Sequence, residues 1–224
     1  EKTVVFQSMI HIASPEFYTD VRNDMKKLQS EDYVFFYEGV KAGTPESMEK
    51  LSQFMGTTVS PEMYDILAEI AGLTFQGDEM YRDILPSTNV DLTTDEIVEL
   101  AETKVTALPA GNQADFIKIL REYYPAFTPL QKDISLVISH GIINMLLRTY
   151  TDPALITGMK DAIPVFDIIL DERNKHIVDT ILASPNQHIY IHYGALHYPG
   201  IVAMLQEKDP RWKEVSRKNF RVIR

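Results

Sequence analysis

Residues 3–12, with the sequence TVVFQSMIHI, decide the fold class of this chain. The segment is rich in β-branched and aromatic residues and is almost continuously apolar. That pattern is typical of a strand buried on both faces, as strands are in a parallel sheet covered by helices. His11 is an ionisable residue near the carboxyl end of this strand.

The two segments that follow complete a β-α-β unit. Ser14 suits a helix cap and Pro15 the first helical position, and apolar residues then recur at helical spacing up to Leu28. Residues 33–40, YVFFYEGV, have the pattern of a second buried strand with Glu38 near its end. Two strands joined by a helix over so short a distance predict parallel pairing with a right-handed crossover.

The middle of the chain is mainly helical in pattern, and strands return near the end. The expected helices lie at 47–55, 61–71, from Thr94 onward, 114–123, 131–150, 163–182 and 201–206, and the expected strands at 89–92, 188–193 and 219–223. The helix at 131–150 is strongly apolar on one face, which carries Ile134, Val137, Ile138, Ile142, Met145 and Leu146.

These segments predict an α/β fold. We expect a central mixed, largely parallel sheet with flanking helices and a helical cap or insertion in the middle of the chain. All of 1–224 forms one domain in this prediction, and the helical cap spans approximately 45–160 and covers the sheet. A chain of 224 residues that is 45% hydrophobic and 24% charged suits one packed domain.

Composition excludes several classes of protein. A formal net charge of −10 disfavours nucleic acid as a partner. The absence of cysteine rules out disulfides, thiolate metal sites and a cysteine nucleophile. No apolar run is long enough to predict a membrane span. The motifs HExxH, GxSxG and GxGxxG are also absent. Because the chain lacks cysteine and begins abruptly at Glu1, we expect an exported protein whose leader has been removed.

Three ionisable side chains follow buried strands: His11, Glu38 and His197. Ligands of parallel α/β sheets bind at the carboxyl ends of the strands, so we expect these three to share a pocket. A carboxylate among aromatic residues needs a partner, because burying it unpaired costs several kcal/mol. Arg173, on the helix at 163–182, is the fourth candidate, since its guanidinium suits a carboxylate or a developing oxyanion.

Four short motifs carry a family resemblance: SMIH at 8–11, FYEG at 36–39, DERN at 171–174 and GALH at 194–197. In these the chain resembles the TraB/GumN/Tiki-like superfamily, whose relatives include erythromycin-esterase-like and haem-binding ChaN-like proteins. Members carry two Gly-x-x-His motifs, a glutamate ending the second strand and an arginine on the helix before the last motif. The matches run in order over nearly the whole chain, and Ser8 stands in the first glycine position.

The resemblance implies metal-dependent proteolysis, as in the Tiki branch, or regulation of peptide pheromone signalling, as in the TraB branch. Many bacterial GumN-like members have no assigned substrate. The departure at Ser8 matters if that position needs a positive backbone angle or the close approach of a ligand, because serine would then reduce activity.

The leading hypothesis is a metal-dependent peptidase acting on a peptide or small-molecule substrate. His11, His197 and Glu38 would bind a divalent metal, Mn²⁺ or Co²⁺ in preference to Zn²⁺, with Glu38 alternatively acting as general base. Arg173 would orient Glu38 or stabilise an oxyanion. The alternatives are a metal-independent esterase-like hydrolase, in which His11 or Glu38 activates water, and a non-catalytic module. That module would bind haem or a peptide through Tyr37, Tyr193 and Tyr198. A homodimer is left open.

Overall fold

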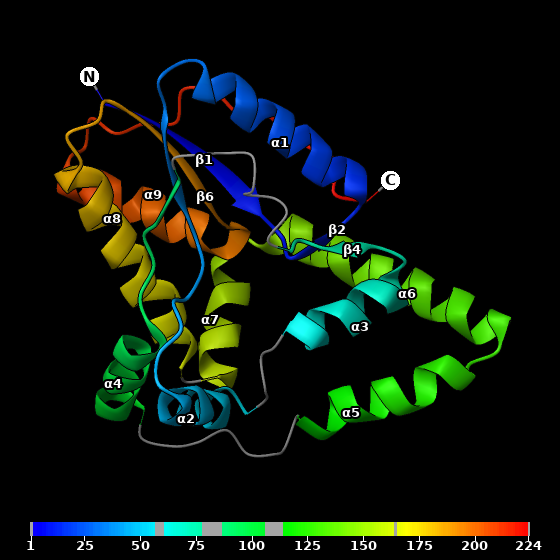
Figure 1. Cartoon of the computed structure of the whole chain (residues 1–224). Coiled ribbons are helices and arrows are strands. Elements are labelled where there is room, and N and C mark those ends of the chain that lie inside the picture. Colours follow the sequence, from blue (N-terminus) through cyan, green and yellow to red (C-terminus); the bar gives the residue numbers. More distant parts are fainter. Residues whose placement is uncertain (1, 57–60, 78–86, 106–113, 164, 224) are drawn as a thin grey trace.

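The computed structural model of the chain describes residues 2–56, 61–77, 87–105, 114–163 and 165–223 (Figure 1). The α/β fold with a parallel central sheet is confirmed. The sheet has the order β1-β6-β3-β5. A separate antiparallel pair is formed by two very short strands, β2 and β4. The strand bounds are β1 Thr3–Met9, β2 Ile12–Ala13, β3 Val34–Tyr37, β4 Thr74–Phe75, β5 Ser87–Asn89 and β6 His188–Gly194.

The register of the sheet brings the ends of its strands to one edge. β6 lies between β1 and β3 and runs parallel to both, with Met9 opposite Gly194 and Tyr37 opposite His192. β5 pairs with the other side of β3 and ends at Asn89, opposite Tyr37. The residues that follow β1, β3, β5 and β6 therefore leave the sheet at the same carboxyl edge, as the sequence predicts.

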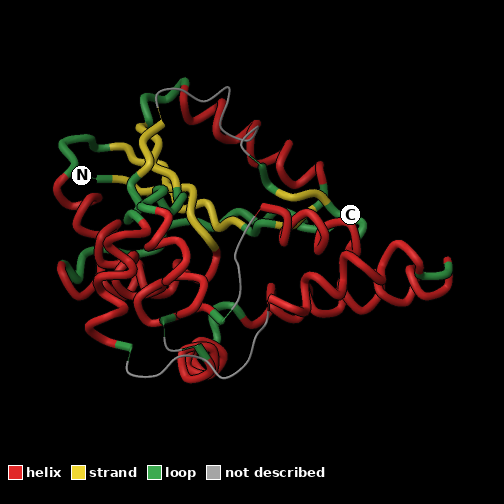
Figure 2. Tube along the Cα trace, turned by 60° about the horizontal axis from the view of Figure 1, so that its bottom comes forward, coloured by secondary structure: helices red, strands yellow, loops and turns green. Residues whose placement is uncertain are grey.

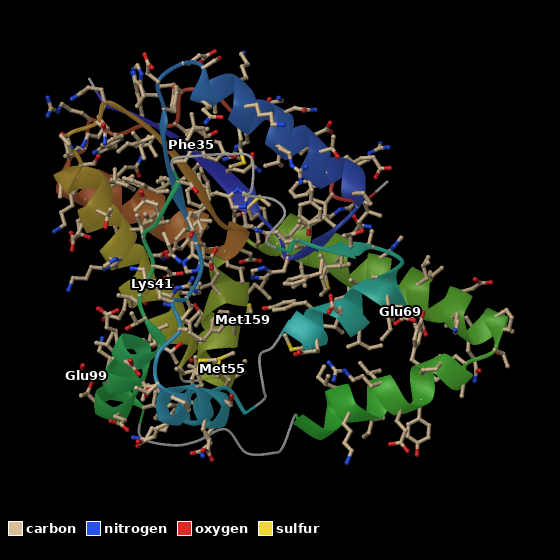
Figure 3. The ribbon with its side chains drawn as sticks, in the orientation of Figure 1. Phe35, Lys41, Met55, Glu69, Glu99 and Met159 are labelled. Atoms are coloured by element: carbon tan, nitrogen blue, oxygen red, sulfur yellow. The ribbon has the colours of Figure 1, made fainter. Side chains whose placement is uncertain are left out.

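Helices cover both faces of the sheet (Figure 1). α1 (Pro15–Gln29) packs on one face, and α8 (Arg173–Ala183) and α9 (Tyr198–Lys208) pack on the other. Side chains alternate along β6, so that Tyr190 faces α1 whereas Ile189 and Ile191 face α8 and α9. Figure 3 labels Phe35 on β3, another member of the α1-side cluster.

Side-chain caps fix where several helices begin. Ser14 accepts a hydrogen bond from the N–H of Phe17 and Pro15 is the first helical residue, as predicted. Thr44 caps α2 (Pro45–Met55) in the same way. α4 (Thr94–Lys104) begins with a capping box between Thr93 and Glu96.

The described middle of the chain is mainly helical, as predicted. α3 (Pro61–Ala71) packs against α5 (Ala114–Tyr123) and α6 (Pro129–Thr149). The connection between α5 and α6 contains a 3₁₀ turn, η2 (Tyr124–Ala126), and α7 (Pro153–Ala162) follows α6. α5 and α6 form a hairpin that projects from the body of the molecule (Figures 1 and 2). The apolar face of α6 is exposed, with Val137 at 68%. α6 uses another side to contact α3, where the His140 ring lies 2.8 Å from the Ala71 carbonyl oxygen.

The chain differs from its sequence pattern at two further places. The last strand, predicted at 219–223, is wrong, because 209–223 has no helix or strand. Val222 accepts one backbone hydrogen bond from Ser14, and Phe220 packs beside α1, so side chains hold this tail where a strand ladder was expected. The long helix predicted at 163–182 contains a π-helical turn, η3 (Ile168–Glu172), directly before α8. No helix in the described ranges is both long and apolar enough to cross a membrane.

The core of the sheet yields a test of stability. Ile191 on β6 is completely buried, whereas Val215 in the tail is 79% exposed. We expect Ile191→Ala to lower the free energy of unfolding by about 2–5 kcal/mol, because it leaves a cavity between β6 and α8. Val215→Ala, the control, should change it by less than about 0.5 kcal/mol. Urea titration followed by circular dichroism measures both, and similar values for the two variants would contradict this description of the core.

Candidate functional site

Glu38 lies directly after β3 and joins the ends of β3 and β6. Its backbone N–H donates to the carbonyl of His192 at 2.9 Å, which extends the strand pairing by one residue. One carboxylate oxygen, Oε1, accepts a hydrogen bond from Arg173 at 2.7 Å, and Oε2 accepts one from the backbone N–H of Gly194. The side chain is mostly buried but remains 15% exposed.

Asp91 anchors the arginine that holds Glu38. It follows β5, its carboxylate is fully buried, and its oxygen Oδ1 accepts a hydrogen bond from Nε of Arg173 at 2.8 Å. The backbone N–H groups of Gly39 and Leu92 and the hydroxyl of Tyr193 also donate to it. Burial lowers the pKa of Arg173, but Glu38 and Asp91 raise it by more, so the guanidinium stays charged. The three charged groups sum to one net negative charge.

The π-helical turn η3 explains how one helix supplies two inward side chains. A π turn contains an extra residue, and such turns are frequent at functional sites. η3 ends immediately before Arg173 and changes the phase of the helix there. Arg173 and its neighbour Asn174 are both buried, 5% and 2% exposed.

His197 sits in the short 3₁₀ turn, η4 (Ala195–His197), that follows β6, and is 4% exposed. Its Nδ1 lies 2.7 Å from Oδ1 of Asn174, an acceptor, so Nδ1 carries the ring proton. Nε2 therefore keeps its lone pair and lies 3.6 Å from Oε1 of Glu38. The centroids of the His197 and Tyr193 rings lie 4.7 Å apart, and the two rings are arranged edge to face.

His11 lies at the rim of this group, in the bend between β1 and β2. Its carbonyl accepts the N–H of Gln76 at 2.8 Å, and its ring contacts that of Tyr64 at 4.8 Å. The residue is exposed, although desolvation lowers the pKa of its imidazole. When protonated, His11 lowers the pKa of both Glu38 and His197. The structure thus brings Glu38, Arg173 and His197 into direct proximity, and places His11 within electrostatic range of them.

The surroundings set the protonation of the site. Burial would raise the pKa of Glu38, but Arg173, the two histidines and the Gly194 N–H lower it to about 2. Burial lowers the pKa of His197 to about 4, although Glu38 opposes this. His192, which faces the same group from within β6, has its pKa lowered to about 3, again by burial. At neutral pH one ionised carboxylate therefore faces neutral imidazoles.

Gly194 lies where the Glu38 carboxylate approaches the backbone closely. Its φ is −53°, which any residue adopts, but a Cβ at this position would lie 3.0 Å from Oε2 of Glu38. A Cβ on Gly200 would meet the amide nitrogen of Asn174 at 2.2 Å. Ser8, in β1, is not among the described non-glycine residues with positive φ, of which Asp32 is the one example. Serine therefore fits the backbone at the first motif.

Several functional neighbours were not predicted from the sequence as site residues. Asp91 carried a usable signal, because it is an acidic residue after a strand and lies between the apolar residues Val90 and Leu92. Asn174 carried none, since an amide on a helix has no distinguishing pattern. Of the tyrosines considered for haem, Tyr193 is fully buried and its hydroxyl is bonded to Asp91, while the Tyr198 hydroxyl donates to Glu214.

The donor atoms fit a cation held by two protein groups. Two ligands bound about 2.1 Å from one divalent ion are separated by about 3.0–3.4 Å. Nε2 of His197 and Oε1 of Glu38, at 3.6 Å, need only a small movement to reach this spacing. Among the described residues no three His, Asp or Glu side chains form a complete ligand set. Any further ligands would have to come from solvent, substrate or a rotated side chain.

A hollow lined by described residues lies elsewhere in the molecule. It has a volume of about 1560 Å³ and runs beside β1, between α9 and the C-terminal tail. Ala195 and Tyr198 touch it, but Glu38, His197 and His11 do not line it. This hollow and the group around Glu38 are therefore separate, and the candidate site is identified by its charges and hydrogen bonds.

Comparisons of this chain with protein-family models, with curated proteins and with solved structures find no match. The chemistry of the site therefore has to be argued from its own geometry.

The close approach at Gly194 can be tested by adding one methyl group. We expect Gly194→Ala to push the Glu38 carboxylate away and to lower the free energy of unfolding by about 1–3 kcal/mol. Gly158→Ala, inside α7 where a Cβ meets nothing, is the matched control and should be neutral or stabilising by up to about 1 kcal/mol. Equal effects in a thermal melt would show that the contact with Glu38 is not what requires glycine.

The lowered pKa values predict sensitivity to acid. Folding lowers the pKa of Glu38 from 4.5 to about 2 and that of His197 from 6.5 to about 4. As the pH falls, both groups are therefore protonated in the unfolded chain at a higher pH than in the folded chain, and this favours unfolding. The resulting stability is complete above pH 6.5 and is lost as the pH falls through 4 towards 2. Urea midpoints measured from pH 7 to pH 3 should decrease, and Glu38→Gln should flatten the profile below pH 4.5. A native profile that stays level between pH 7 and pH 4 would refute this.

Proposed function

We propose that this protein is a hydrolase assisted by a divalent metal, of the peptidase type, with its reaction centre at the carboxyl edge of the sheet. The observation that carries the proposal is a neutral imidazole nitrogen of His197 placed 3.6 Å from an ionised oxygen of Glu38. Two electron-pair donors at this spacing repel each other unless a proton or a cation lies between them. The pKa values of both groups argue against a proton at neutral pH.

The charge balance supports a cation as well. Arg173 neutralises one of its two carboxylate partners, so the group formed with Glu38 and Asp91 keeps one negative charge. That charge is poorly solvated, because Asp91 is buried and Glu38 is mostly buried. A buried, uncompensated charge is costly, and binding a cation relieves that cost.

The residues then take distinct roles. His197 and Glu38 would hold the cation, with His11 as the third residue of the set. A bound divalent cation supplies Lewis-acid activation of water or of a carbonyl group. Asn174 keeps the proton on Nδ1 of His197 and so leaves Nε2 free to bind. Arg173 donates to two carboxylates and is buried, so we assign it to positioning Glu38 in preference to contacting an oxyanion.

The alternatives have less support from the geometry. A metal-independent hydrolase needs a base whose pKa lies near the working pH. The candidate bases are His11 and Glu38. Glu38, with a pKa of about 2, is a weak base at pH 7, and desolvation lowers the pKa of His11 below its usual value. A haem-binding module would need a tyrosine free to bind, and Tyr193 donates its hydroxyl to Asp91. The resemblance to the TraB/GumN/Tiki-like superfamily agrees with the metal-assisted hydrolase and is part of this proposal.

Peptide hydrolysis with and without metal tests the function. We expect turnover of a mixed fluorogenic peptide library in the presence of Mn²⁺ or Co²⁺, its loss in EDTA, and recovery on adding metal back. Glu38→Gln and His197→Gln should each lower kcat/KM by at least about 100-fold, because they remove a ligand. His188→Gln is the control, since His188 lies at the opposite, exposed end of the same strand and should leave kcat/KM unchanged.

Metal binding provides a readout independent of the substrate. Calorimetric titration with Mn²⁺ should show one site in the native chain and at least a tenfold weaker one in His197→Gln. Turnover that resists EDTA would favour the metal-independent hydrolase. Neither turnover nor binding at this site would overturn the proposal.

A further inference from the structure

The projecting helix α6 carries a continuous apolar surface that no described part of the chain covers. Val137 is 68% exposed and Ile134 is 50% exposed. The exposed residues recur at spacings of three and four and so lie along one side of the helix: Leu130, Ile134, Val137, Ile138, Ile142, Met145 and Leu146. We call this set the α6 stripe.

The stripe is not needed to attach α6 to its own chain. The contacts to α3 come from another side of the helix, through the ring of His140 and the side chain of Leu136 beside Gly72. Between Asp133 and Arg148 the helix has no Asp, Glu, Lys or Arg. A helix that is apolar on its outer as well as its inner side is typical of one buried on both sides.

The central residues of the stripe are arranged symmetrically about a point between positions 139 and 140. Ile134 and Met145 are equally far from that point, and so are Val137 and Ile142. The next pair inward is Ile138 and Gly141. An identical helix that crosses in the opposite direction about a two-fold axis there would place each residue beside its counterpart. This is the self-complementarity that a symmetric dimer requires.

The shape and the charges at the ends match the same arrangement. A shallow hollow of about 390 Å³ lies over Gly141, Met145 and Arg148, where the missing side chain of Gly141 leaves open space. The counterpart of Gly141 is Ile138, so the large side chain of one helix meets the hollow of the other. Asp133 and Arg148 are both exposed. Antiparallel crossing places Asp133 opposite Leu146 of the second copy, two residues from its Arg148, so the acid and the base come near each other.

We propose that the α6 stripe is the surface through which two copies of this chain associate, with their α6 helices antiparallel and Ile138 of each beside Gly141 of the other. A lipid surface fits this helix less well. Membrane-surface helices carry Lys and Arg along the polar face, whereas here the chain has a net charge of −10 and the charged residues of α6 are limited to Lys132, Asp133 and Arg148.

Sedimentation analysis of the full chain tests the association. We expect a dimer that dissociates as the concentration is lowered, and Val137→Asp should shift its Kd upward by at least 100-fold, because two charges would be buried at the contact. Val215→Asp, which adds the same charge at an exposed valine of the tail, should leave Kd unchanged. Circular dichroism should show native folding in both variants, since neither valine is buried.

Charge reversal tests the antiparallel direction. Asp133→Arg and Arg148→Asp should each weaken the dimer several-fold, because each places like charges together across the axis. The double variant Asp133→Arg with Arg148→Asp should restore the native Kd, because the pairs are exchanged. A native chain that is monomeric at every concentration overturns the proposal, as does a dimer that Val137→Asp leaves intact. Binding of the monomer to phosphatidylcholine–phosphatidylglycerol vesicles through the stripe would instead assign it to a lipid surface and also overturn it.

Discussion

The ion pairs of Arg173 are the interaction on which the candidate site depends. The guanidinium joins Asp91 after β5 to Glu38 after β3, and Glu38 in turn accepts the N–H of Gly194 at the end of β6. Three strand ends and α8 are thereby tied together through buried charges. Removing one partner of such a network costs about 3–5 kcal/mol, because the remaining charge is left unpaired.

The same network explains why the site holds one unsatisfied negative charge beside a neutral imidazole. A fully paired cluster would be a structural feature with no capacity for a ligand. Here Arg173 forms ion pairs with two carboxylates. His197 is kept neutral by burial, and Asn174 orients its ring. The cluster is also open at one side, where Glu38 is partly exposed and His11 stands at the rim. Rigid support behind the site and access in front of it are what a binding centre needs.

The sequence was sufficient to predict the parallel sheet and the edge of the sheet where the candidate site lies. It was insufficient to predict the contacts within the site. Apolar strands ending in His11, Glu38 and His197 identified the carboxyl edge, because parallel topology forces those ends together. The sequence could not reveal that Arg173 binds Asp91 as well as Glu38, since Asp91 and Arg173 are 82 positions apart in the chain. The π turn before Arg173 was equally hidden, because a single inserted residue leaves no clear mark in the apolar pattern of a helix. The helix α6 was predicted, but its packing was not, since an apolar helix face predicts burial and does not identify the partner.

The account predicts that a cation binds between His197 and Glu38, and diffraction from crystals soaked in Mn²⁺ tests this most directly. An anomalous difference peak within bonding distance of both Nε2 of His197 and Oε1 of Glu38, about 2.0–2.3 Å from each, is the predicted result. Crystals saturated with Mn²⁺ that show no peak there, with the two atoms still 3.6 Å apart, would contradict it.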